Sequence, residues 1–246
     1  MGSTHHIKFS RPLLKWWHAH GRKDLPWQQD PSVYKTWISE IMLQQTQVIT
    51  VIPYFKKFIK TFPSVRSLAD ATEDQVMSHW SGLGFYSRAR NLHKSAKIIL
   101  DQYKGQIPKR LEELIALPGI GRSTAGAILS LSSIAPSPIL DGNVKRVLTR
   151  FFNISGDLKL SKTNNKLWSL AIGCLPETDY SFYTQAIMDL GATICTSKKP
   201  QCVICPVKKN CIAFEKNLVS LLPTKTIKKK KPKQTVFFLI LKDQDN

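Results

Sequence analysis

The chain has 246 residues, of which 36 are Lys or Arg and 17 are Asp or Glu, so its formal net charge is +19. This length is sufficient to bury a core in one domain or in two close-packed ones. Basic residues outnumber acidic ones even without the lysines between positions 225 and 233. The folded body is therefore basic, which predicts a polyanionic partner. The sequence contains no long apolar span and no signal-like start, which argues against a membrane protein and favours a soluble intracellular one.

Apolar residues recur at three- and four-residue spacing along most of the chain, which predicts an all-α fold. In chain order, the expected helices span 7–20, 31–45, 47–61, 73–80, 86–103, 110–116, 122–133, 143–152, 162–175 and 180–195. Gly21 ends the first helix, and residues 24–27 are expected to form a loop. Thr72 begins a capping box at the start of a later helix. The clearest strand signal is Thr235–Leu241.

A glycine-rich turn interrupts the helical pattern near the middle of the chain. Pro118, Gly119 and Gly121 predict a tight hairpin, because glycine alone accepts the required backbone angles at low cost. The N–H groups at the start of the helix that follows have no intrahelical partner, so they can bind a phosphate. Asp141 lies close enough in sequence to place a carboxylate near a strand held in this way. Taken locally, its simplest role is the N-cap of the helix near Val144.

Four of the five cysteines lie near the C-terminus in the spacing C-x6-C-x2-C-x5-C. They are Cys195, Cys202, Cys205 and Cys211. An odd and clustered set in an intracellular chain indicates a metal site rather than disulfides. Four thiolates can hold zinc or an iron–sulfur cluster. The fifth cysteine, Cys174, is most simply a small buried apolar residue.

Glu40 belongs to an apolar stripe of the helix expected at 31–45. The residues that share one face of this helix are Val33, Trp37, Glu40, Ile41 and Gln44. A carboxylate among apolar neighbours has a raised pKa, which suits a general acid near neutral pH. By periodicity alone, the simpler interpretation is an exposed Glu at the edge of the stripe.

Several segments resemble the MutY-type adenine glycosylases of the helix–hairpin–helix DNA glycosylase superfamily. They are Gly21–Gln28, Ser39–Val48, Trp80–Leu92, the hairpin with its loop at 135–138 and Asp141, and Asn165–Trp168. The similarity covers roughly residues 15–222. It implies an enzyme that releases adenine from double-stranded DNA in which adenine lies opposite 8-oxoguanine or guanine. It also implies a monomer that is cytoplasmic and nucleoid-associated in a bacterium, with no membrane partner.

The resemblance implies a helix–hairpin–helix glycosylase fold with the active site in a cleft between two domains. A helical-barrel domain is expected at 28–136. The second domain would combine 1–27 with 137–222 and hold a [4Fe–4S] cluster on the four clustered cysteines, whose spacing matches the family's loop. Zinc is then the minor alternative. Residues 223–246 are expected to form a basic linker and the first strand of a Nudix-like domain whose remainder is absent.

The resemblance also assigns roles to individual residues. Glu40 would protonate the adenine and help to activate water, Asp141 would stay ionised and stabilise the sugar, and Asn143 would orient the pair. The residues expected to line the pocket for the flipped base are Trp27, Gln28, Leu43 and Ser123. The residues expected to contact DNA are Gln45 and Phe85, as wedges in the duplex, and Gly119, Gly121, Arg122 and Lys145. Many relatives have Tyr in place of Phe85, which keeps the stacking surface and removes a hydroxyl.

Three alternative functions are weighed against this one. Ser123 stands where endonuclease III-type glycosylase/lyases carry the Lys that forms a Schiff base, and serine cannot do this chemistry. An oxidised-pyrimidine glycosylase/lyase is therefore disfavoured, and a monofunctional glycosylase is expected. The presence of Glu40 and Asp141 argues against a non-catalytic DNA-binding module. An electron-transfer iron–sulfur protein would leave the basic body and the hairpin unexplained.

Overall fold

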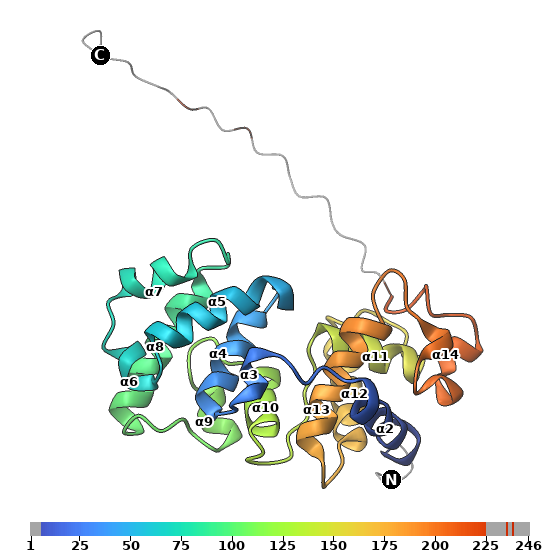
Figure 1. Cartoon of the computed structure of the whole chain (residues 1–246). Helices are drawn as coiled ribbons and strands as arrows, with labels where there is room; N and C mark the ends of the chain where they lie inside the picture. Colours follow the sequence, from blue (N-terminus) through green and yellow to red (C-terminus); the bar gives the residue numbers. More distant parts are fainter. Residues whose placement is uncertain (1–5, 225–234, 236–237, 239–246) are drawn as a thin grey trace.

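The computed structural model describes residues 6–224 together with 235 and 238, and every regular element in this part of the chain is helical (Figure 1). The prediction of an all-α fold is confirmed. None of the described helices combines the length and apolar character needed to cross a membrane. The strand expected at Thr235–Leu241 falls outside the described residues, apart from two isolated positions.

The first lobe is formed by consecutive helices in the first half of the chain (Figure 1). They are α3 (Pro26–Gln29), α4 (Val33–Leu43), α5 (Val48–Thr61), α6 (Val65–Ala69), α7 (Glu73–Trp80), α8 (Ser87–Gln102), α9 (Leu111–Ile115) and α10 (Arg122–Leu131). Its core forms around large, fully buried side chains such as Trp37, Phe58 and Trp80. Because one aromatic core unites these short helices, their stability comes from packing more than from local propensity.

The second lobe brings the N-terminal helices against the later part of the chain (Figure 1). Its elements are the π-helix η1 (His6–Ser10), α2 (Arg11–His20), α11 (Gly142–Phe151), α12 (Ser161–Cys174), α13 (Tyr180–Asp189), the π-helix η2 (Leu190–Ile194), the 3₁₀-helices η3 (Cys202–Ile204) and η4 (Lys208–Asn210), and α14 (Ile212–Glu215). Phe9 and Leu13 are fully buried in its core, together with Val144 and Leu148 of α11. Cys174 is buried here as well, as predicted.

Helix α10 connects the two lobes, because it contacts α4 on one side and α13 on the other. Ala125 and Ile128 of this helix belong to the first core, and Ala127 belongs to the second. Gly126 permits the loop before α11 to lie against α10, since a Cβ there would be 2.4 Å from the carbonyl oxygen of Pro138. This close approach fixes where the chain enters α11. The domain boundaries proposed at 28 and 136 remain predictions.

Local signals explain most helix starts. The Thr72 hydroxyl accepts a hydrogen bond from the Gln75 N–H (3.2 Å), and the Gln75 side chain accepts one from the Thr72 N–H (2.8 Å), so the predicted capping box is confirmed. Ser32 caps α4 by accepting from the Lys35 N–H. Gly21 caps the end of α2, as expected.

The structure differs from the sequence-based expectations at four places. The loop expected at 24–27 is interrupted by the start of α3. Pro26 is the first residue of this helix, a position where proline is well tolerated. The second helix ends at Leu43 rather than near Gln45, because Gln45 takes a left-handed conformation (φ 57°). The helix expected at 180–195 widens at Leu190 into η2, where the Thr193 hydroxyl donates to the carbonyl of Asp189. The short helix α6 was not predicted.

Candidate active site between the two lobes

Glu40 points from α4 into a cleft of about 570 Å³ between the lobes. Its wall from the first lobe includes Trp27, Leu43 and Thr46 beside Glu40, and its wall from the second includes Asp141 and Asn143. The cleft extends toward the hairpin, where Gln45, Gly121 and Ser123 line it. Glu40 is thus half-buried in a cavity and is not the exposed edge residue that periodicity alone favoured.

Asp141 is the N-cap of α11, and its side chain accepts a hydrogen bond from the Val144 N–H at 2.7 Å. The backbone before it is fixed by Ser123, whose hydroxyl accepts a hydrogen bond from the Leu140 N–H at 2.9 Å. The carboxylate also lines the same cleft as Glu40. Asp141 is therefore an N-cap, as its local sequence predicts, and its side chain also lines the cleft.

The environments of the two carboxylates differ. Burial, and then the nearby charge of Asp141, raise the pKa of Glu40 to about 8. Burial also raises the pKa of Asp141, but the N–H groups of Val144 and Asn143 and the charge of Arg146 oppose this shift. Hydrogen bonds and cations that favour the ionised form are thus concentrated on Asp141. A pair of this kind can supply one neutral acid and one anion at the same pH.

Asn143 is the second residue of α11 and lines the cleft beside Asp141. Its side-chain oxygen accepts a hydrogen bond from Arg146 at 2.8 Å, and Arg146 also donates to the carbonyls of Gly191 and Cys195. Gly191 lies so close that a Cβ there would be 2.7 Å from the Cβ of Asn143. The orientation of Asn143 is therefore set by α11 and η2 together.

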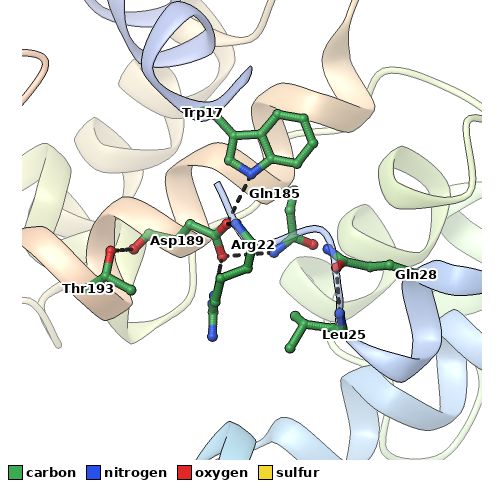
Figure 2. Close-up of polar contacts among 7 residues, drawn as sticks. All are labelled: Trp17, Arg22, Leu25, Gln28, Gln185, Asp189 and Thr193. Carbon is green, nitrogen blue, oxygen red and sulfur yellow. Dashed lines mark hydrogen bonds and ion pairs between the residues drawn. The ribbon is translucent and has the colours of Figure 1, made fainter. Parts of the chain in front are cut away.

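A buried polar network lies at the crossing from α2 to α3 (Figure 2), and two of its members, Arg22 and Gln185, line the cleft. Asp189 is 1% exposed and accepts hydrogen bonds from Trp17 Nε1 (2.9 Å) and Gln185 Nε2 (3.0 Å). It also pairs with Arg22, whose Nη2 lies 2.6 Å from Asp189 Oδ1. A buried carboxylate needs such partners. The network ties the N-terminal crossing segment, which precedes Trp27, to α13.

The predicted base-pocket residues separate into two groups. Trp27, Leu43 and Ser123 line the cleft that contains Glu40. Gln28 lines a neighbouring cavity that shares Trp27 with the cleft, and its side-chain oxygen accepts a hydrogen bond from the Leu25 N–H at 3.2 Å (Figure 2). Gln28 is therefore engaged in capping α3, and its role in a base pocket remains a prediction.

The glycine-rich turn has the expected hairpin form, but its two glycines differ. Gly119 adopts a φ of +80°, which glycine accepts readily. Gly121 is the N-cap of α10 with a φ of −87°, which any residue can adopt, so the expectation that its angle requires glycine is wrong. A Cβ at Gly121 would meet no atom within 4 Å. The N-terminus of α10 thus opens onto free space, as an anion site requires.

Arg122 and Lys145 follow the N-termini of α10 and α11, respectively. The Arg122 guanidinium lies over the ring of Trp168, 4.1 Å from its centroid, and Arg122 is exposed. Lys145 is half-buried in the first turn of α11. Their contacts with DNA remain predictions.

Gln45 and Phe85 are exposed, and each has a left-handed backbone, with φ values of 57° and 51°. Such a conformation is uncommon for residues with a Cβ and persists only where the surrounding structure holds it. Phe85 is 54% exposed, so its ring is not part of the core.

The four clustered cysteines line one small cavity at the end of the second lobe, together with Arg150. Arg150 Nη1 lies 3.5 Å from the sulfur of Cys195 and donates to the carbonyl of Thr196, so a cation braces this loop. Among the described residues, no three or more His, Cys, Asp or Glu side chains converge closely enough for a single metal ion. Four sulfur donors around one cavity are nevertheless the donor set of an iron–sulfur cluster.

Sequence reasoning assigned no role to Arg22 and Gln185, which line the cleft, or to Asp189, the buried carboxylate that both of them bind. One signal was present, because Gln185 and Asp189 are four residues apart in α13 and therefore face the same way. The partner of Asp189 was not predictable, since Arg22 is distant in sequence.

A family model described as "HhH-GPD superfamily base excision DNA repair protein" matches residues 38–171. A relative named adenine DNA glycosylase, from Buchnera aphidicola subsp. Acyrthosiphon pisum, is 52% identical over 97% of this chain and 68% of its own length. A solved thermostable thymine-DNA glycosylase superposes with a TM-score of 0.78 at 26% identity, over 87% of this chain and 98% of its own. An endonuclease III in a non-covalent DNA complex has the same fold, with a TM-score of 0.73 at 20% identity over 89% and 98% of the two chains. The chain belongs to the HhH-GPD superfamily of base excision DNA repair proteins.

Proposed function

We propose that the chain is a monofunctional adenine DNA glycosylase that acts on adenine opposite 8-oxoguanine or guanine in double-stranded DNA. The observation that carries the proposal is the pair of carboxylates, Glu40 and Asp141, facing one cleft from two lobes. The name of the relative from Buchnera aphidicola supports the choice of adenine. The excess of basic residues supports a nucleic-acid partner.

In this reaction Glu40 is the general acid. Cleavage of the N-glycosidic bond leaves negative charge on the departing base, so protonation of an adenine ring nitrogen favours departure. With its pKa raised to about 8, Glu40 carries the required proton at neutral pH. After transfer, its carboxylate can take a proton from the water that attacks the sugar.

Asp141 supplies the negative charge near the sugar. The departing base leaves an oxocarbenium-like ring, which an adjacent anion stabilises. The Val144 N–H and the positive charge of Arg146 help Asp141 to remain ionised. Asn143, held by Arg146, orients this pair.

The remaining candidate residues bind the DNA around the reacting nucleotide. Trp27 and Leu43 offer apolar walls for a flipped base, with Gln28 behind Trp27 and Ser123 at the far end of the cleft. The phosphate backbone would be held by the hairpin N–H groups of Gly119 and Gly121. The nearby cations Arg122 and Lys145 would add positive charge. Gln45 and Phe85 would enter the duplex.

Cys195, Cys202, Cys205 and Cys211 would hold a [4Fe–4S] cluster, supported by the cavity that all four line. When bound, the cluster supplies a cross-link that fixes the loop after η2. We further propose that the enzyme acts as a monomer in the cytoplasm, on nucleoid DNA.

The test is single-turnover base release from four duplexes, with adenine opposite 8-oxoguanine, guanine, cytosine or thymine. Fast release opposite 8-oxoguanine and guanine, with little opposite thymine, is expected. A fifth duplex carries an oxidised pyrimidine opposite guanine. Release of that base without release of adenine would instead assign the chain to the oxidised-pyrimidine glycosylase/lyases.

A further inference from the structure

Arg88 is a buried cation in the first turn of α8, with only 7% of its surface exposed. Its Nη1 donates to the carbonyl oxygens of Ile41 (3.1 Å), Met42 (2.7 Å) and Gln44 (2.6 Å) at the end of α4. These carbonyls are at the negative end of the helix and lack intrahelical partners. Arg88 therefore holds the backbone up to the residue directly before Gln45.

The other side of the same guanidinium holds a second loop. Its Nη2 donates to the carbonyl of Gly84 (3.1 Å) and to the Thr46 hydroxyl (3.1 Å). The guanidinium also lies 5.3 Å from the ring centroid of Phe85 and 5.4 Å from that of Trp80. Arg88 therefore also holds Gly84, the residue directly before Phe85, and contacts the ring of Phe85.

Gln45 and Phe85 are thus linked through one side chain. Each is exposed, has a left-handed backbone and follows a carbonyl that Arg88 binds. Strained residues keep such conformations only where their surroundings hold them. A planar guanidinium with a fixed fork of donors can hold both loops at once, whereas the point charge of Lys cannot.

We propose that Arg88 is a positioning residue that fixes the spacing of Gln45 and Phe85, so that both side chains enter a base stack as one unit. This inference rests on the proposed function and identifies the element that extrudes the target base. Side chains that insert into the base stack offset the cost of unstacking more fully when they are already ordered, because less conformational entropy is lost on binding. Arg88 supplies this order without contacting the base.

The test compares Arg88→Lys with the matched control Arg90→Lys in the full chain. Arg90 lies on the same helix, half-exposed beside Glu73, outside this set of contacts. Adenine release is measured in single turnover on a duplex with adenine opposite 8-oxoguanine. It is measured again on a duplex with adenine opposite an abasic-site analogue, where no base pair must be broken. A third duplex carries 2-aminopurine as the target, because its fluorescence rises when it leaves the stack.

Arg88→Lys is expected to slow release from the paired substrate on the order of 10- to 100-fold, as displaced positioning groups do, and to reduce the 2-aminopurine signal. Release from the unpaired substrate should stay within about threefold of wild type, since only extrusion is impaired. Arg90→Lys should match wild type on all three duplexes. Equal loss on both adenine substrates, or no loss on the paired one, would overturn the proposal.

Gly84→Ala provides a second variant if Arg88→Lys does not fold. The added methyl group would meet no atom within 4 Å, so it disturbs chiefly the backbone of a residue with a φ of +77°. The same selective loss is expected, and uniform loss or full activity would contradict the proposal. Release by wild type from the unpaired substrate tests the proposed function independently of Arg88.

Discussion

The carboxylates of Glu40 and Asp141 face one cleft from opposite lobes, and the charge of Asp141 adds to burial in raising the pKa of Glu40 to about 8. Glu40 comes from the middle of α4, whereas Asp141 caps the N-terminus of α11. The relationship therefore depends on how α10 and the loop before α11 join the two lobes. It also sets the protonation states of these two carboxylates, on which catalysis and its dependence on pH rest.

Glu40→Gln should abolish adenine release while duplex binding persists. The amide keeps the shape of the side chain but cannot transfer a proton to the base. Single-turnover release and a binding titration at fixed salt concentration check both parts. Excision at the wild-type rate would show that another group is the acid.

The rate of release should fall as pH rises through about 8. The pKa of Glu40 is raised to about 8, so the protonated form is lost above that pH. At low pH the rate should fall again as Asp141 becomes protonated, at a pH above the usual range for Asp because its pKa is also raised. A bell-shaped profile from single-turnover rates is the expected result. A rate that does not change between pH 7 and 10 would contradict the assignment of Glu40.

The free energy of unfolding should also depend on the titration of Glu40. Because the pKa of Glu40 is higher in the folded state than the ordinary value of 4.5, folding binds a proton between pH 4.5 and about 8. The stability that this group contributes is full below pH 4.5 and is lost as pH rises through about 8. Glu40→Gln should therefore be more stable than wild type at pH 9 and closer to it at pH 5. Denaturant unfolding at both pH values measures the difference.

Two substitutions at Asp141 should separate its structural and chemical roles. Asn is as good an N-cap as Asp, so Asp141→Asn should keep most of the stability and lose activity because the negative charge near the sugar is gone. Asp141→Ala should lose the activity and in addition about 0.5–2 kcal/mol of stability, since the Val144 N–H loses its partner. Equal thermal stability of the two variants would show that the cap contributes nothing.

The clustered cysteines should bind iron. Metal analysis of anaerobically prepared protein is expected to find about four irons per chain, as a cluster on four cysteines requires. Cys202→Ser should lower the iron content, whereas Cys174→Ser, at a buried cysteine away from the cavity, should not. Stoichiometric zinc without iron would assign the site to a single metal ion.

The DNA strand should remain intact after adenine is released, until alkali is added. Ser123 accepts a hydrogen bond from the Leu140 N–H and offers no amine for a Schiff base. Borohydride should therefore trap no protein–DNA adduct with wild type. Ser123→Lys is the informative variant, because trapping that appears only there would show that this position separates glycosylase from lyase chemistry.

Sequence periodicity and local caps determined most of the secondary structure. The positions of α5, α7, α8 and α12 follow from apolar spacing, and Thr72 and Gly21 act at helix ends as their residue types predict. The hairpin and the clustered cysteines could also be recognised from the sequence. All of these signals involve residues close in sequence, where the interaction is nearly independent of the rest of the fold.

Predictions of secondary structure from local sequence failed where contacts with other parts of the fold constrain the backbone. The widening of α13 into η2 is accompanied by a local bond from the Thr193 hydroxyl to the carbonyl of Asp189. The left-handed turn at Gln45, by contrast, follows a carbonyl that is held by Arg88, a residue distant in sequence. A periodic pattern contains no information about such a partner. The capping role of Gln28 was missed for a different reason, because its helix has only four residues.

The residues of the candidate site were predicted from the resemblance of their segments to a known family, but the environment of each side chain was decided by tertiary structure. Periodicity alone placed Glu40 at an exposed edge and gave Asp141 a cap. That these residues would meet was expected only from the family resemblance. The approach of Pro138 to Gly126 brings Asp141 to the cleft, where burial and a neighbouring charge shift the pKa of Glu40. Desolvation and electrostatic coupling depend on distances between chain segments far apart in sequence, and only the folded structure fixes those distances.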